Sequence, residues 1–227
     1  YYANATGNYS RAMGYFTNAS GGSSTAIGNY TSASGYYSTA MGYDTEASGG
    51  SSTAIGSNTS ASGSSSTAMG SNTVASGDFS TAMGLRTNAP SYAETAIGGY
   101  NTDYTPNSKN NWDISDRLFV IGNGVYNAKS DAMVVLKNGN TGIGNSTPEV
   151  KLQVDGGSDA ALNGGGYFMT NTFVSTNIVI DDNEIMARNN GNAATLNLNY
   201  NGGVIMYGPG GLAQNSDASL KKNIKTI

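Results

Sequence analysis

The sequence predicts an all-β protein in which residues 1–100 form a parallel β-roll of 14-residue coils and later residues form further β-structure. The first observation is an Ala-x-Gly motif that recurs every 14 residues from Ala12 to Ala96. The second is a related series half a period away, from Ala5 to Ala89. The third is composition: the 227 residues include 32 Gly but only 36 Leu, Ile, Val and Phe, too few for an ordinary compact core.

Each 14-residue unit divides into two halves, and each half predicts a strand of four or five residues followed by a two-residue turn. A coiled coil is excluded, because the halves are rich in Gly, Ser and Thr and lack an apolar seam. The first strand, residues 24–28, barely varies between copies, which predicts that both of its faces are constrained. The second strand keeps Thr31, Ala33 and Gly35, but the residue after the Thr varies, which predicts one solvated face.

The first strand needs a second buried surface, because a single roll has only one interior. We expect that surface to come from other copies of the chain, and three copies would close a ring with point symmetry. The low apolar content of one chain also favours a homotrimer over a free monomer. The predicted trimer seam is the Ile/Met column at Met13, Ile27, Met41, Ile55, Met69, Met83 and Ile97.

The pattern SxAxGxxSxAxG with its 14-residue period resembles the head repeats of YadA-like trimeric autotransporter adhesins over residues 3–100. The resemblance implies a trimeric, left-handed parallel β-roll. Collagen-binding coils of that family read Asn-Ser-Val-Ala-Ile-Gly, whereas this chain has Ser-Thr-Ala-Ile/Met-Gly, so the fold carries over and collagen as the ligand does not. The last coil departs from the pattern at Pro90, Ser91 and Glu94, as expected of a terminal cap.

Residues 101–116 predict a polar connector, whose Trp112 is expected to plug the base of the roll or to fix the next module. The region 117–215 predicts a β shaft with a hairpin turn at Asn138-Gly139. Segments 139–156 and 181–199 resemble tail-fibre-like proteins of bacteria and phages, which implies intertwined trimeric β-structure. The predicted strands of the shaft are 117–121, 131–137, 140–143, 151–154, 172–180, 184–188, 194–200 and 204–207.

Residues 216–227 predict a short helix start, because Ser216 is a good N-cap and Asp217 suits the first turn. The segment resembles the opening of the intramolecular chaperone of endosialidase, which trimerises β-rich fibres and then cuts itself away. The resemblance implies that Ser216 is a nucleophile assisted by Lys221 and supported by Asp217, with cleavage after Asn215. An intact full-length chain that carries its chaperone would refute this self-cleavage.

Aromatic residues in the turns are the candidate ligand-binding residues, because exposed rows of rings suit glycan stacking or protein recognition. They gather in the first three coils, whereas later turns carry mostly Ser, Gly and Asn. The alternative interpretation is that Tyr is an ordinary residue at a β edge. The candidates are Tyr9, Tyr15, Phe16, Tyr30, Tyr36, Tyr37 and Tyr43.

The sequence argues against several classes of site. The absence of Cys and His removes disulfides, the usual zinc ligands and His-based catalysis, and neither a metal nor another cofactor is expected. Without a basic patch or a long apolar run, neither nucleic-acid binding nor membrane insertion is expected. Residues 1–100 hold only Asp44, Glu46, Asp78 and Glu94, spread along the repeats, so the chain is predicted not to be an enzyme apart from single-turnover self-cleavage.

The leading hypothesis is therefore a structural and adhesive segment of a trimeric, surface-exposed fibre that binds a glycan or protein receptor. The alternative is a tail fibre or tailspike of a phage or contractile injection system with glycan-directed activity. Both place the protein outside the cell, at a cell surface or on a particle tail. An ice-binding solenoid is a minor alternative, because the two Thr columns, represented by Thr25 and Thr17, lie on different strands.

Overall fold

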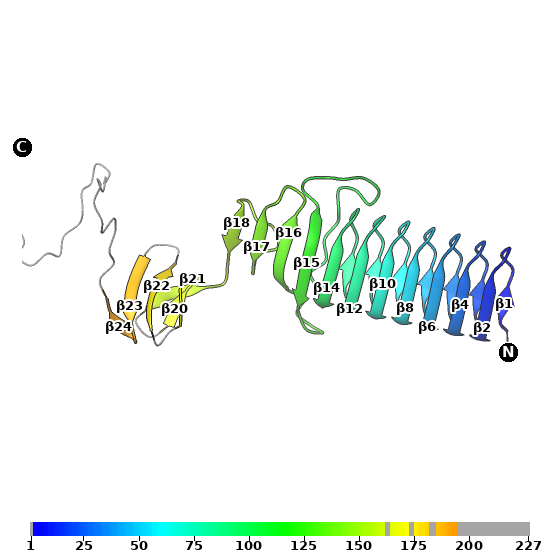
Figure 1. The fold of residues 1–227 in the computed structure, drawn as a ribbon, viewed down its shortest axis with the longest axis horizontal. Helices are drawn as coiled ribbons and strands as arrows, with labels where there is room; N and C mark the ends of the chain where they lie inside the picture. Colours follow the sequence, from blue (N-terminus) through cyan, green and yellow to red (C-terminus); the bar gives the residue numbers. More distant parts are fainter. Residues whose placement is uncertain (1, 162–163, 173–174, 182–184, 195–227) are drawn as a thin grey trace, which may run out of the picture. The chain divides into compact units, whose positions relative to one another are not determined.

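The computed structural model describes residues 2–161, 164–172, 175–181 and 185–194. It divides the chain into two compact units, residues 1–157 and 158–227, and each is described by itself (Figure 1). Every regular element within the described ranges is a β-strand. The prediction of an all-β fold with stacked 14-residue coils is confirmed.

The roll consists of coils that each contribute one five-residue strand and one two-residue strand to two parallel sheets (Figure 1). Strands of neighbouring coils pair without any shift in register, as Ala26 does with Ala40 and Ala33 with Ala47. The long strands are β2 (Arg11–Tyr15), β4 (Thr25–Asn29), β6 (Thr39–Tyr43), β8 (Thr53–Ser57), β10 (Thr67–Ser71), β12 (Thr81–Leu85) and β14 (Thr95–Gly99). The short strands are β1 (Asn4–Ala5), β3 (Asn18–Ala19), β5 (Ser32–Ala33), β7 (Glu46–Ala47), β9 (Ser60–Ala61), β11 (Val74–Ala75) and β13 (Asn88–Ala89).

The short strands have two residues rather than the four or five that the sequence predicts. Their hydrogen bonding gives the reason. Ser32 N donates to Thr45 O at 2.8 Å in the regular ladder, but Ser34 N and Gly35 N both donate to Ala47 O, at 3.0 and 3.2 Å. Two successive amides that share one carbonyl end the ladder, and the chain bends away towards the next turn.

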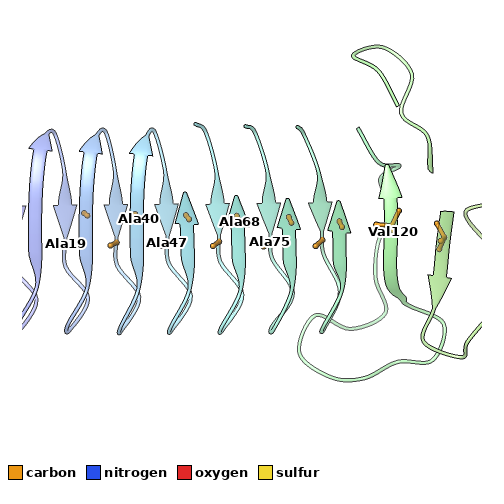
Figure 2. Packing of buried hydrophobic residues seen from close by; sticks show 14 residues of the cluster. Ala19, Ala40, Ala47, Ala68, Ala75 and Val120 are labelled. Atoms are coloured by element: carbon orange, nitrogen blue, oxygen red, sulfur yellow. The ribbon is translucent and has the colours of Figure 1, made fainter. Parts of the chain in front are cut away.

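Small side chains fill the narrow interior between the two sheets. Ala26 and Ala33 are fully buried, and so are their equivalents in the neighbouring coils, several of which Figure 2 labels. Ser24 and Thr31 are buried with them. Because side chains of a strand alternate between its faces, Ile27 lies on the outer face of the long-strand sheet. The interior therefore holds Ala, Ser and Thr residues from both halves of each unit, and it buries little apolar surface.

Both turns of a coil use a left-handed backbone at a residue other than glycine. In the coil that contains β4 and β5, these residues are Tyr30, with φ of 54°, and Tyr37, with φ of 59°. Each is held by a hydrogen bond to the preceding coil, from Tyr30 N to Tyr15 O and from Tyr37 N to Gly22 O, both at 2.9 Å. Contacts between coils thus support a conformation that bulky residues rarely adopt.

The long-strand sheet continues beyond residue 100 through four more strands. They are β15 (Arg117–Asn123), β16 (Asp131–Leu136), β17 (Thr141–Ile143) and β18 (Leu152–Val154). β15 pairs in parallel with β14 and places Val120 beside Ala96, and Val120 is fully buried (Figure 2). Val120 follows Ala96 by 24 residues, ten more than the spacing within the roll. Residues 101–116 therefore connect two adjacent strands of one sheet.

The predicted strands from 117 to 154 agree with β15 to β18, and the hairpin turn at Asn138-Gly139 joins the antiparallel pair β16 and β17. Trp112 does not plug the base of the roll, because its side chain is 53% exposed. The Lys137 Nζ atom lies 5.6 Å from the centroid of its ring instead. The polar sequence around Trp112 offers no apolar enclosure that would bury it.

The second unit contains β22 (Thr176–Ile180) and β23 (Ile185–Asn189), which are antiparallel and agree with predicted strands. Its buried Arg188 donates from Nε to Asn177 Oδ1 at 2.8 Å and from Nη1 to Gly164 O at 2.9 Å. The predicted strands at 194–200 and 204–207 lie outside the described residues, except for residue 194. The sequence did not predict β19 (Ser158–Ala161), β20 (Gly164–Gly166), β21 (Phe168–Met169) and β24 (Asn192–Ala193).

One glycine in each long strand is required by the distance between coils. Gly56 has φ of 129°, and a Cβ atom added to it would overlap the carbonyl oxygen of Gly70 in the next coil. Backbone cannot move aside there without breaking the ladder. Gly50, in a turn, has open space around the position of a Cβ atom.

We expect Gly56→Ala to destabilise the protein by more than about 2 kcal/mol, since it combines backbone strain with a clash. The matched Gly50→Ala should change stability by less than about 1 kcal/mol. Thermal unfolding followed by circular dichroism measures both. Equal melting temperatures for the two variants would contradict the role of coil spacing.

Candidate binding surfaces

The outer face of the long-strand sheet carries the predicted Ile/Met column. The side chain of Met13 in the first coil is 66% exposed and that of Met41 is 38% exposed, whereas Ile27 and Ile55 are half-buried. All of them lie on the surface of the single chain rather than in its interior. The structure thus brings the seven predicted seam residues together on one face.

The column also extends further than the repeats. Ile97 pairs with Ile121, Ile121 with Met133, Met133 with Ile143, and Ile143 with Val154. Residues that oppose one another across a ladder share a face of the sheet. The apolar column therefore runs without interruption through all eleven strands, from β2 to β18. Periodicity could not find the last four members, because they follow the 14-residue repeats.

Four of the seven aromatic candidates form one cluster at the turn that follows the long strands. The rings of Phe16 and Tyr30 stack at 5.3 Å with an interplanar angle of 3°, and Tyr15 packs edge-on against Phe16 at 4.5 Å. Tyr43 contacts Tyr30 at 6.4 Å. Tyr2, which was not among the predicted residues, extends the cluster by contacting Phe16 at 5.6 Å. We call these five residues the aromatic ladder.

The other three candidates lie at the opposite turn of the coil, so the structure separates them from the aromatic ladder. Tyr36 and Tyr37 pack edge-on at 4.3 Å, and both are 59% exposed. The hydrogen bond and charge interaction with Tyr36 raise the pKa of Tyr37 above its usual value. Tyr9 is 87% exposed. The aromatic ladder is the larger of the two surfaces, and each of its rings contacts a ring of another coil.

Polar side chains close the base of the roll, where β13 would otherwise leave an unpaired edge. Asn101 occupies the position of the buried Thr in earlier coils, and its side chain replaces backbone: Oδ1 accepts from Asn88 N at 2.8 Å, and Nδ2 donates to Asn88 O at 3.0 Å. Arg117 forms a buried ion pair with Asp131, with 3.2 Å between Nη2 and Oδ2. Because the side chain of Asn101 occupies the edge of β13, that edge is protected against pairing with a further strand.

Glu94 is the buried carboxyl group of this base. Its Oε2 accepts from Ser91 N and from Tyr104 Oη, each at 3.0 Å, while Oε1 has no hydrogen-bond partner among the described residues. Burial raises the pKa of Glu94 to about 7, despite the hydrogen bonds from Ser91 and Tyr104 that lower it. Burial, together with the charge of Glu94, likewise raises the pKa of the Tyr104 phenol. Glu94 is therefore partly protonated near neutral pH.

Comparison with known proteins agrees with this geometry. Residues 3–31, 33–59 and 61–87 match a family described as the YadA head domain repeat. The N-terminal roll carries YadA head repeats. These repeats are structural, adhesin-type domains, and the sequence resemblance to them is confirmed for these residues. No curated protein matches the chain.

The remaining predicted residues are not brought into a site. Ser216, Asp217 and Lys221 lie outside the described residues. Where the structure describes the chain, no group of three or more acidic residues could hold a metal ion. Nor does any helix in those ranges have the length and apolarity needed to cross a membrane.

The raised pKa of Glu94 predicts a pH-dependent stability. The folded state binds the proton more tightly than the unfolded chain, whose pKa is near 4.5, so stability falls as pH rises from about 4.5 to about 7. Glu94→Gln removes this titration and should stabilise the protein above pH 7 by about 1–3 kcal/mol, with a smaller effect at pH 5. Melting temperatures at pH 5 and 8 test this. A difference between variant and wild type that does not depend on pH would contradict it.

Proposed function

We propose that this chain is a segment of a homotrimeric, surface-exposed fibre of the adhesin type, whose head binds a cell-surface or matrix receptor. The observation that carries the proposal is the uninterrupted apolar column on the outer face of an eleven-stranded sheet. A soluble single chain rarely leaves such a face open to water, because apolar surface is stabilised by burial. The match to YadA head repeats supports the same interpretation.

Three features favour a trimer closed through this face. The interior of one roll contains Ala, Ser and Thr, so it contributes little burial of its own. The column is straight, because the strands pair in unshifted register from β2 to β14. Its continuation through Met133 and Ile143 extends the same contact beyond the matched repeats. Division into a head (1–100), a connector (101–116), a shaft (117–215) and a chaperone start (216–227) stays a prediction.

The aromatic ladder is the proposed receptor site. Stacked and edge-on rings present a rigid surface that loses little side-chain freedom on binding, and such surfaces suit sugars and protein loops alike. Phe16 and Tyr30 lie in the turn that follows the long strands, whereas Tyr15 and Tyr43 are the last residues of β2 and β6. The proposed trimer therefore closes around the Ile/Met column and leaves this end of the long strands accessible.

The alternatives differ in how well the described residues support them. The tail-fibre hypothesis rests on the resemblance of segments 139–156 and 181–199 and on the terminus that contains Ser216 and Lys221. The first segment is described and the second is described in part, whereas the terminus lies outside the described residues. The ice-binding hypothesis is weakened, because the Thr17 column is buried inside the roll. The Thr25 column forms a single row of Thr, and the neighbouring row on the same strands is the Ile/Met column rather than a second row of Thr.

Trimer formation through the apolar column predicts that two variants differ in trimer affinity although the residues replaced in them are similarly exposed. Met41→Ser with Met69→Ser removes apolar contacts from the proposed seam and should weaken the trimer at least about tenfold. Val74→Ser, on the outer face of the short-strand sheet, should have no effect; Val74 and Met41 are both 38% exposed. Light scattering across a concentration series measures the mass. A wild-type protein that stays monomeric would refute the trimer.

Receptor binding through the aromatic ladder predicts that Phe16→Ser with Tyr30→Ser weakens binding to receptor-bearing cells at least about tenfold, because central aromatic contacts dominate interfaces. Phe79→Ser is the control, since Phe79 lies at the opposite turn and is more exposed than Phe16 and Tyr30. Flow cytometry with the labelled trimer measures binding. Equal losses in both proteins would argue against the ladder, and release of shortened glycan would favour the tailspike alternative.

A further inference from the structure

A charged hollow lies at the C-terminal end of the roll, apart from the aromatic ladder. It has a volume of about 250 Å³ and is lined by Asn72 and Arg86 of two successive turns, by Asn88 of β13, and by Asp103 and Lys129 of the loops that follow the roll. The volume is slightly below the range of drug-sized pockets, so the hollow suits a single small ring.

Arg86 is the distinctive residue of this hollow. Residues 1–100 contain only two basic residues, Arg11 and Arg86. Arg86 occupies the left-handed turn position, with φ of 51°, and no carboxylate pairs with it among the described residues. Its guanidinium carbon lies 5.1 Å from the ring centroid of Tyr126 and 5.8 Å from that of Tyr100. A guanidinium held over aromatic faces keeps its N–H edge free to bind an anion in its plane.

The other lining groups define which anion fits. Lys129 Nζ and Asp103 Oδ2 form an exposed ion pair at 2.5 Å, so the hollow has one positive charge in excess. Asp103 disfavours a doubly charged anion and can accept hydrogen bonds from hydroxyl groups. The side chain of Asn88 makes no hydrogen bond to the described residues, so its amide is available to a ligand. Tyr126 does not line the hollow, and its role is to support Arg86.

We propose that this hollow binds a sugar that carries one carboxylate, of the uronic or sialic acid class. Arg86 binds the carboxylate through two parallel hydrogen bonds, which is the geometry that its planar fork favours. Asn88 and Asp103 bind the hydroxyl groups of the ring. Tyr126 and Tyr100 hold Arg86 in place.

The position of the hollow is compatible with the proposed trimer. Asn88 points outward from the short-strand sheet, whereas the apolar column lies on the outward side of the long-strand sheet. A trimer closed through the column leaves three hollows exposed, and simultaneous occupation strengthens binding to a dense glycan surface. The hollow is a second binding site, separate from the aromatic ladder, and it rests on the proposed adhesive function only for its biological meaning.

The test measures the binding of soluble monosaccharides to the purified chain by saturation-transfer NMR and by calorimetry. Glucuronate and N-acetylneuraminate are the probes, and glucose is the neutral control. Wild type should bind either acidic sugar and not glucose. Arg86→Gln should weaken binding at least about tenfold, because it removes charge-assisted hydrogen bonds.

Arg11→Gln is the matched control, since it removes the only other basic residue of the first 100 and should leave affinity unchanged. Tyr126→Ser should weaken binding by a smaller factor, because Arg86 loses one of its two supporting rings. The melting temperature of each variant verifies folding. Absence of binding at saturating probe, equal binding of glucose, or unchanged affinity in Arg86→Gln would each overturn the proposal. None of these results depends on the oligomeric state, so they are distinguishable from failure of the trimer.

Discussion

The close approach of successive backbones is the constraint on which the roll depends. Each coil hydrogen-bonds to the next through both strands and both turns, in the same register throughout. At this spacing, Gly56 and its equivalents have no room for a side chain. The interior is correspondingly thin and accepts only residues such as Ala26 and Thr31. A fold stabilised so strongly by its ladders, and so weakly by apolar burial, leaves its larger apolar residues outside.

The end of the roll shows how such a stack is closed. A solenoid that simply stopped would present bare amides and carbonyls to any further strand. Here the side chain of Asn101 satisfies one edge, while β15 continues the other edge as an ordinary sheet. The change from stacked coils to a meander therefore occurs within a single sheet. As a result, the base of the roll buries polar groups. Glu94 and the Arg117–Asp131 pair lose their hydration there, and hydrogen bonds and charge pairing with neighbouring residues compensate for that loss.

The sequence predicted the parts of the structure that repeat and failed where the repeat is interrupted. The long strands, the outward Ile/Met column and both turns follow from comparing copies within the chain. β15 was recognised as a strand but not as a continuation of the roll, because ten extra residues and Val120 in place of Ala conceal the motif. The two-residue strands depend on shared hydrogen bonds at Ala47, which no pattern reveals. The hollow at Arg86 combines residues from separate loops, so it could be found only in three dimensions.

The left-handed turns have an evolutionary consequence. The same strained position holds Phe16, Tyr30, Asp44 or Arg86 in different coils. The ladders absorb the strain whichever side chain is present, so exchanging one side chain for another there hardly affects folding. Natural selection can therefore change the side chains displayed along this edge, one coil at a time, while the backbone scaffold of the roll stays constant. Such separation of display from scaffold suits a molecule whose targets change faster than its architecture.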